Sequence, residues 1–324
     1  MQHLMSFVAI LALGPHFPEA QLAPVEDPIQ EQVIAAIDKL GGRVERDVHR
    51  PGRPVIRVDF SGTSLAGDDL KFLATLKDLQ SLRLGHTGVT DADLERLKGL
   101  TFLTELGLYE TSITDAGLAH LENMSSLRTL HLGHTRITDV GLAHLKGLTG
   151  LTCLGLISTG ISDGGLVHLQ DMTHLNRLFL GQTDITDQGL RHIEGLTALR
   201  ELGLSGTRIT DVGLSHVAKL TELTNLNLGD TPITNAGLLH LQALPGITSL
   251  WLCGTNITDD ALVVVERMTG LTNLHLGRTC ITDAGVEHLK TLCSLRFLAL
   301  TQTDIGREKV EELRKALPGC TISY

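Results

Sequence analysis

The sequence predicts an α/β solenoid, an open array of coils that each contribute a short strand, a turn and a short helix. Two observations predict this fold class. Within each unit, a stretch that alternates apolar and polar residues precedes a stretch whose leucines are three apart. These units recur every 24 residues, which indicates about eleven full stacked coils. The anchor positions of the repeat are Phe60, Leu84, Leu108, Leu132, Leu156, Leu180, Leu204, Leu228, Leu252, Leu276, Leu300 and Tyr324.

One unit shows what each part of the repeat is expected to form. Residues 127–132 alternate with period two, which predicts a short strand, and residues 142–148 carry leucines on one helical face. Thr138 lies just before that face and is suited to cap the helix, while the acid Asp139 in the first turn suits the helix dipole. A single unit buries too few aliphatic side chains to offset the entropy of ordering its backbone. The coils are therefore expected to be stable only when stacked.

Two further positions recur with the same period. A threonine follows every anchor from Thr63 to Thr303, and its hydroxyl is expected to bond the backbone of the turn that leaves the strand. A glycine is expected to let the helix start close to the neighbouring coil. The glycines at this position are Gly117, Gly141, Gly165, Gly189, Gly213, Gly237 and Gly285.

The ends of the chain predict caps and a leader. Residues 27–54 are expected to form an N-terminal cap with a helix at 29–40 and a short strand at 43–47; the repeats occupy 55–304, and residues 305–324 form a C-terminal helix and strand. Residues 1–26 are expected to be a leader or possible signal peptide, since residues 4–14 are apolar but too few to span a bilayer. No Lys or Arg precedes this apolar run, but the run itself favours export over a cytoplasmic location. The alternative is a leader that the fold does not use.

Charge and cysteine content exclude several classes of function. The formal net charge is −10, and a phosphate-binding surface needs clustered basic residues, so nucleic acid is not expected as a partner. The five cysteines follow neither a CxxC pattern nor a zinc spacing and are expected to be free thiols. No segment long enough to cross a membrane is predicted.

The many histidines and aspartates form ladders rather than a catalytic cluster. A column with one ligand per coil brings at most two neighbours together, too few for a tetrahedral metal site. No nucleophile-elbow, zincin, P-loop or dinucleotide motif is present. We expect no catalytic residue, metal or cofactor. The histidines at one position are His120, His144, His168, His192, His216, His240 and His288, and the acids at another are Asp91, Asp115, Asp139, Asp163, Asp187, Asp211, Asp259 and Asp283.

The unit L-x-x-L-x-L-x-x-T-x-I-T-D-x-G-L-x-H-L resembles the leucine-rich-repeat family, in a variant with Thr in place of the usual Asn. It is similar to the ribonuclease-inhibitor-like and cysteine-containing subtypes and to bacterial tandem arrays, and the resemblance covers residues 55–324. It implies a curved horseshoe with a parallel sheet on the concave face and helices on the convex face. It also implies a role in binding proteins and no catalytic residues.

The residues on either side of each anchor are expected to face the concave surface, where a partner would bind. Large side chains and glycines alternate there from coil to coil, so this face repeats every 48 residues. Trp251 with Cys253 breaks the alternation. At ~4.8 Å per strand, Phe179 and Trp251 are ~14 Å apart, which predicts anchors for an extended ligand rather than one small pocket. The candidate contacts are Trp251, Phe179, Tyr109, His131, His275, Cys253, Asn227 and Asp230.

The sequence therefore predicts a non-enzymatic, monomeric scaffold that binds a protein or peptide of unknown identity on its concave face. One alternative is the substrate-recognition subunit of a ubiquitin-ligase complex, like F-box proteins with similar repeats, although only about 54 residues precede the repeats to hold an adaptor-binding domain. The other alternative is a structural surface protein with no specific ligand. Variation clustered around Trp251 would favour recognition.

Overall fold

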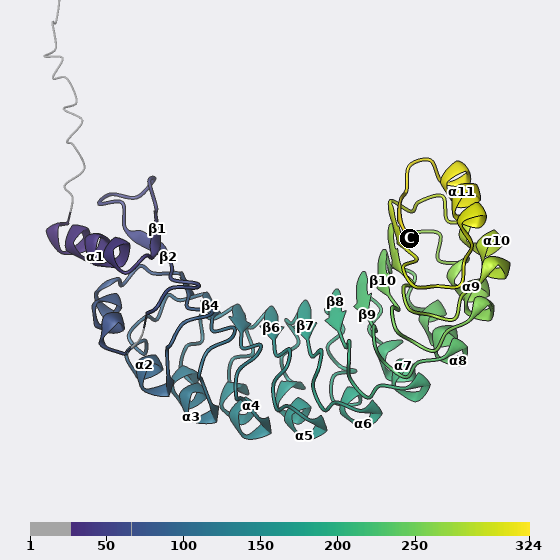
Figure 1. Cartoon of the computed structure of the whole chain (residues 1–324). Coiled ribbons are helices and arrows are strands. Elements are labelled where there is room, and N and C mark those ends of the chain that lie inside the picture. The colour runs from purple at the N-terminus through teal and green to yellow at the C-terminus, as the bar shows by residue number, and fades with distance from the viewer. Residues whose placement is uncertain (1–26, 66) are drawn as a thin grey trace, which may run out of the picture.

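The computed structural model describes residues 27–65 and 67–324, and it confirms the predicted fold class. The chain winds into an open arc with the sheet along its inner side and the helices along its outer side (Figure 1). In this part of the chain the sheet has 13 strands in chain order. They are β1 Arg43–Arg46, β2 Val55–Asp59, β3 Ser81–Arg83, β4 Glu105–Gly107, β5 Thr129–His131, β6 Cys153–Gly155, β7 Arg177–Phe179, β8 Glu201–Gly203, β9 Asn225–Asn227, β10 Ser249–Trp251, β11 Asn273–His275, β12 Phe297–Ala299 and β13 Thr321–Ser323.

Short helices connect the strands on the outer side of the arc. Several outer segments mix α-helix with 3-10 helix, and the first coil has only the 3-10 helix η1 Gly67–Thr75. None of the helices in the described residues is both long and apolar enough to pass through a membrane. The others are α1 Pro28–Lys39, α2 Asp91–Glu95, α3 Asp115–Leu118, η2 Ala119–Leu121, α4 Asp139–Leu145, α5 Asp163–Leu166, η3 Val167–Leu169, α6 Asp187–Leu190, α7 Asp211–Val217, α8 Asn235–Leu238, η4 Leu239–Ala243, α9 Asp259–Val265, η5 Asp283–Gly285, α10 Val286–Leu289 and α11 Arg307–Ala316.

The strands from β2 to β13 are parallel and stay in register, so equivalent residues of successive coils lie side by side. In β9 and β10, for example, Leu226 pairs with Leu250 and Asn227 with Trp251. In strands β3 to β12 the middle residue and the following anchor point into the core, as Leu130 and Leu132 do at 0% exposure. Side chains on either side of them therefore face the concave surface.

The threonine after each anchor supports the turn that leaves the strand. From Thr87 to Thr303 its hydroxyl donates to the carbonyl of the anchor three residues earlier, as Thr207 Oγ1 does to Leu204 O at 2.6 Å. Thr63, beside Gly41 of the N-terminal segment, is the exception, because its buried hydroxyl has no hydrogen-bond partner. The sequence expectation is therefore confirmed for ten of these eleven threonines and wrong for the first.

The aspartate ladder has a stronger structural role than the helix-dipole argument predicts. Seven of the eight carboxylates reach the next coil and accept both the backbone N–H and the hydroxyl of its capping residue, and Asp283 accepts only the N–H of Gly306. Asp211 does so from Thr234 at 2.8 and 2.6 Å, and the Thr234 hydroxyl in turn accepts from Ala236 N. The same pair of contacts recurs at five earlier coils and once later in the array. The acids therefore bond each coil to its neighbour.

The repeating glycine leaves room for this carboxylate. A Cβ built on Gly213 would overlap the Asp187 carboxylate of the preceding coil and lie 2.8 Å from Ile209 Cγ2. A helical Gly→Ala substitution ordinarily stabilises a protein. Here we expect Gly213→Ala to lower the free energy of unfolding by about 1–2 kcal/mol, because the site is overpacked.

Urea unfolding followed by circular dichroism measures this effect. The matched control is Gly147→Ala, since no atom lies within 4 Å of a Cβ at Gly147. The control is expected to be neutral or slightly stabilising. A Gly213→Ala protein as stable as the unchanged chain would contradict the close approach of the two coils.

The two ends of the array differ from its interior. At the N-terminal end, β1 pairs antiparallel with β2, and α1 buries Val33 and Ile37 against the first coil. At the C-terminal end, β13 buries Ile322, but Tyr324 is 48% exposed and its hydroxyl donates to Ile305 O. The expectation that Tyr324 acts as a buried anchor is wrong, because β13 is the last strand of the sheet. The predicted leader, residues 1–26, lies outside the described residues.

Candidate binding face

On the concave face, large residues contact the glycines of neighbouring coils. A Cβ built on Gly155 would lie 3.0 Å from His131 Nδ1, and one on Gly203 would lie 3.2 Å from Phe179 Cδ1. His131 and Phe179 thus lean over the glycine of the next coil, whereas Cys253 lies against Gly229 of the preceding coil. Strands are only ~4.8 Å apart, and a concave face brings side chains still closer, so two large neighbours compete for one space.

Phe179 and Trp251 line one hollow, which we call the central hollow. Its volume is about 240 Å³, and its lining residues are Ile157, Phe179, Gly181, Glu201, Leu202, Gly203, Ser205, Asn225, Asn227 and Trp251. The expectation that these two aromatic residues cannot share a pocket is wrong. Gly203 lacks a side chain and leaves the floor open between them. The strands β7 and β10 that carry the two aromatic residues lie on the inner side of the arc (Figure 1).

Trp251 interrupts the glycine alternation because an aromatic stack replaces it. The Trp251 and His275 rings are stacked with centroids 5.2 Å apart, and His275 meets Phe297 at 5.0 Å. Burial lowers the pKa of His275, which keeps the imidazole neutral at pH 7. The stack therefore holds the indole at the rim of the central hollow without placing a charge behind it.

A second hollow, the N-terminal hollow, has a volume of about 440 Å³ and contains Tyr109 and His131. The Tyr109 ring packs between His86 and His134, with centroids 5.2 and 4.9 Å away. Burial lowers the pKa of His131. Ile157 and Phe179 line both hollows, so the two lie next to each other along the sheet, and we refer to them together as the groove.

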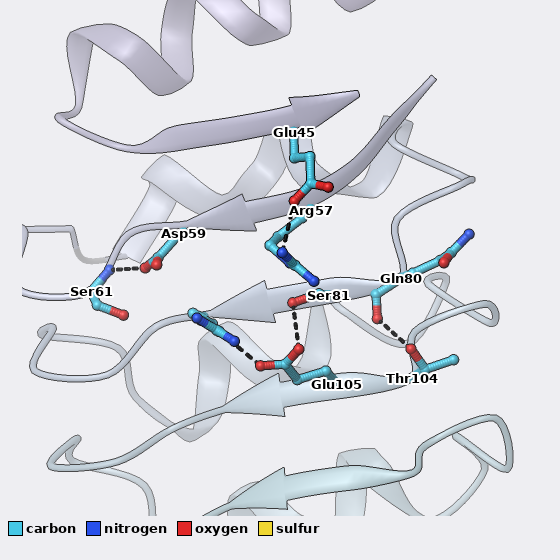
Figure 2. A network of polar contacts seen from close by, with 9 residues as sticks. Glu45, Arg57, Asp59, Ser61, Gln80, Ser81, Thr104 and Glu105 are labelled. Atoms are coloured by element: carbon cyan, nitrogen blue, oxygen red, sulfur yellow. Dashed lines mark hydrogen bonds and ion pairs between the residues drawn. The ribbon is translucent and has the colours of Figure 1, made fainter. Parts of the chain in front are cut away.

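The N-terminal end of this groove is polar and internally paired. Glu105 accepts from Arg83 Nε at 2.7 Å and from Ser81 Oγ at 3.0 Å, the latter contact shown in Figure 2. Burial opposes ionisation of Glu105, but these hydrogen bonds outweigh it and lower its pKa. Arg57 pairs with Glu45 beside this network (Figure 2). The charges at this end are satisfied within the protein.

The remaining candidates lie apart from the central hollow. Asp230 forms an ion pair with Arg278 at 2.9 Å, two coils away. Cys253 lies over Gly229 and does not line either hollow. His275 stacks against Trp251 and does not line the central hollow. The structure therefore gathers Phe179, Asn227 and Trp251 at one site, Tyr109 and His131 at another, and leaves Asp230 and Cys253 near the loop edge.

Sequence reasoning missed a third column of residues on the concave face, which lies three residues before each anchor. Glu201 and Asn225 belong to this column and line the central hollow. The period-two alternation was sufficient to find them, because residues i and i+2 of a strand share a face.

The histidine ladder lies on the outer helices, and three of its members contact acids of the preceding coil. His144 contacts Glu122, His216 contacts Glu194, and His288 contacts Glu266. Among the described residues no group of three His, Cys, Asp or Glu side chains is placed to hold a metal ion. All five cysteines are free.

Comparisons with known proteins agree with this architecture. The family described as "Leucine Rich repeat" matches residues 123–145 and 195–218. No curated protein matches the sequence. The fold is that of a leucine-rich-repeat solenoid, and the family model matches two segments of its array.

Three similar solved structures illustrate the fold. An internalin from Listeria monocytogenes has 21% identity and a TM-score of 0.51, with 93% of this chain and 98% of that chain covered. Internalin C2 from the same species has 24% identity and a TM-score of 0.52, with 70% and 93% covered. A leucine-rich-repeat protein from Leptospira interrogans has 22% identity and a TM-score of 0.53, with 78% and 74% covered. These identities support the shared fold alone.

Proposed function

We propose that this protein is a non-enzymatic scaffold that binds a protein or peptide partner along the groove of its concave face. The observation that carries this proposal is the central hollow, where two aromatic side chains border an open glycine floor. Aromatic residues in a concave, partly apolar site are favoured anchors for a partner. Leucine-rich-repeat domains of the kind found in the similar structures are typically interaction domains, which agrees with this role.

Substitution of the indole tests the proposal. The array is first used to capture its partner, and the affinity of that partner is then measured by titration calorimetry. Trp251→Ala is expected to raise the dissociation constant at least ~10-fold, because the variant loses a rim of the hollow and its stacking area.

The control for this measurement is Val140→Ala, because Val140 is 66% exposed on helix α4, away from the groove. Its affinity is expected to be unchanged, and both variants are expected to unfold near the transition of the unchanged chain. A partner that binds Trp251→Ala as tightly as the unchanged chain would overturn this use of the concave face.

We further infer that the array is monomeric and exported, and that it belongs to the subtype with Thr after the anchor. The apolar run at residues 4–14 supports export. Amino-terminal sequencing of the mature protein tests this, and a mature chain that still begins at Met1 would contradict a cleaved signal peptide.

A further inference from the structure

The central hollow contains an acidic group without a partner. Of its lining residues, Glu201 is the one that carries a formal charge. No described residue donates a hydrogen bond to its carboxylate or forms an ion pair with it within 4.0 Å. Arg177 lies opposite Glu201 in the register of strands β7 and β8 without an ion pair between their side chains, and it lies outside the lining of the hollow. The carboxylate is therefore available to a ligand.

An equivalent carboxylate elsewhere in the array shows what Glu201 lacks. Glu105 occupies the same position of its coil, four coils earlier, in the same sequence context E-L-G-L. It is satisfied by the guanidinium of Arg83, whose Nε donates to Glu105 Oε1 at 2.7 Å. At the hollow, the position equivalent to Arg83 is Phe179. An aromatic ring thus replaces the internal guanidinium and leaves the acid unpaired.

The other walls of the hollow suit the same group. Phe179 leans over Gly203, and the stacked indole of Trp251 forms the opposite rim. Arginine is the cation most often found against aromatic faces, and its planar fork of donors matches a carboxylate. The Asn225 side chain adds an amide oxygen that can accept a further donor. The formal charge of −10 favours the approach of a basic partner.

We propose that the central hollow binds the side chain of an arginine presented by the partner polypeptide, with its guanidinium paired to Glu201 and held between Phe179 and Trp251. This inference rests on the proposed function, since it names the chemistry of the partner that the groove recognises. The arginine supplies from outside the contact that Arg83 supplies to Glu105 within the chain.

The single tryptophan of the sequence gives a direct readout, because its emission reports on the hollow alone. The probes are capped pentapeptides of glycine and serine with a central arginine, citrulline or lysine. Citrulline keeps the shape of arginine and removes its charge. The arginine peptide is expected to bind at least ~10-fold more tightly than the citrulline peptide, and more tightly than the lysine peptide.

Two variants show whether Glu201 is responsible. Glu201→Gln is expected to erase the difference between the arginine and citrulline peptides and to remove the weakening of binding by salt. Glu222→Gln makes the same charge change at an exposed position outside the hollow and is expected to preserve both. Thermal unfolding of each variant confirms that the array is intact.

Equal affinity for the arginine and citrulline peptides, or an arginine preference that survives Glu201→Gln, would overturn the inference. Lysine binding as tightly as arginine would overturn the assignment to a guanidinium. If these results are obtained while Trp251→Ala still weakens binding of the captured partner, the inference fails and the proposed function stands. If Trp251→Ala also leaves the partner's affinity unchanged, both fail.

Discussion

Asp211→Ala is expected to lower the free energy of unfolding by about 3 kcal/mol. The carboxylate accepts two hydrogen bonds from Thr234, at 2.8 and 2.6 Å, and hydrogen bonds to a charged group contribute ~1.5–3 kcal/mol each. Removing it leaves the cap of helix α8 without its partner in the preceding coil. Urea unfolding followed by circular dichroism gives the change.

The chain itself supplies a more conservative substitution at this position. Asn235 replaces the acid one coil later and keeps both contacts, since its Oδ1 accepts from Thr258 N at 2.9 Å and its amide donates to the Thr258 hydroxyl. Asp211→Asn is therefore expected to cost less than ~1 kcal/mol. Asp171→Ala, at an exposed acid outside the ladder, is the control for the loss of charge. A loss of stability that is the same for all three variants would contradict the inter-coil role.

Gly203→Leu is expected to weaken partner binding at least ~30-fold without unfolding the array. Gly203 forms the floor of the central hollow, and a side chain there occupies the space between Phe179 and Trp251. The array is expected to stay folded because this column already holds two large side chains in adjacent coils, Trp251 and His275. Titration calorimetry with the captured partner measures the loss of affinity.

The control for this substitution is Ala299→Leu, which adds a leucine to the same column of the concave face. Ala299 lies four coils from Gly203 and lines neither hollow. We expect its affinity to be unchanged. If Gly203→Leu binds the partner as Ala299→Leu does, the partner does not enter the central hollow.

The repeated features of the fold could be predicted from sequence because the residues that form them recur in every coil. The leucine spacing predicts the strands and helices, and the threonine after each anchor predicts a turn that ten coils show. The role of the aspartates was predicted less well. Their bonds join residues 23 positions apart, as Asp211 and Thr234 are, and local helix rules do not consider the neighbouring coil.

The candidate site could be predicted only in part. Trp251 and Phe179 stand out because they are large side chains in a column of alternating glycines. The central hollow between them depends on the curvature of the arc and on the direction in which Phe179 leans. The prediction from strand spacing alone treated the sheet as flat and included neither. Glu201 was missed because its significance lies in the absence of a partner, which becomes visible only beside the paired Glu105.

Hydroxyl-radical footprinting of the array with its captured partner tests the central claim most directly, because it reports the exposure of individual aromatic side chains. Binding in the groove predicts that Phe179 and Trp251 lose reactivity in the complex. Phe102, which is 63% exposed and lines neither hollow, is predicted to keep its reactivity. Unchanged reactivity of Phe179 and Trp251 in a saturated complex would contradict binding at the central hollow.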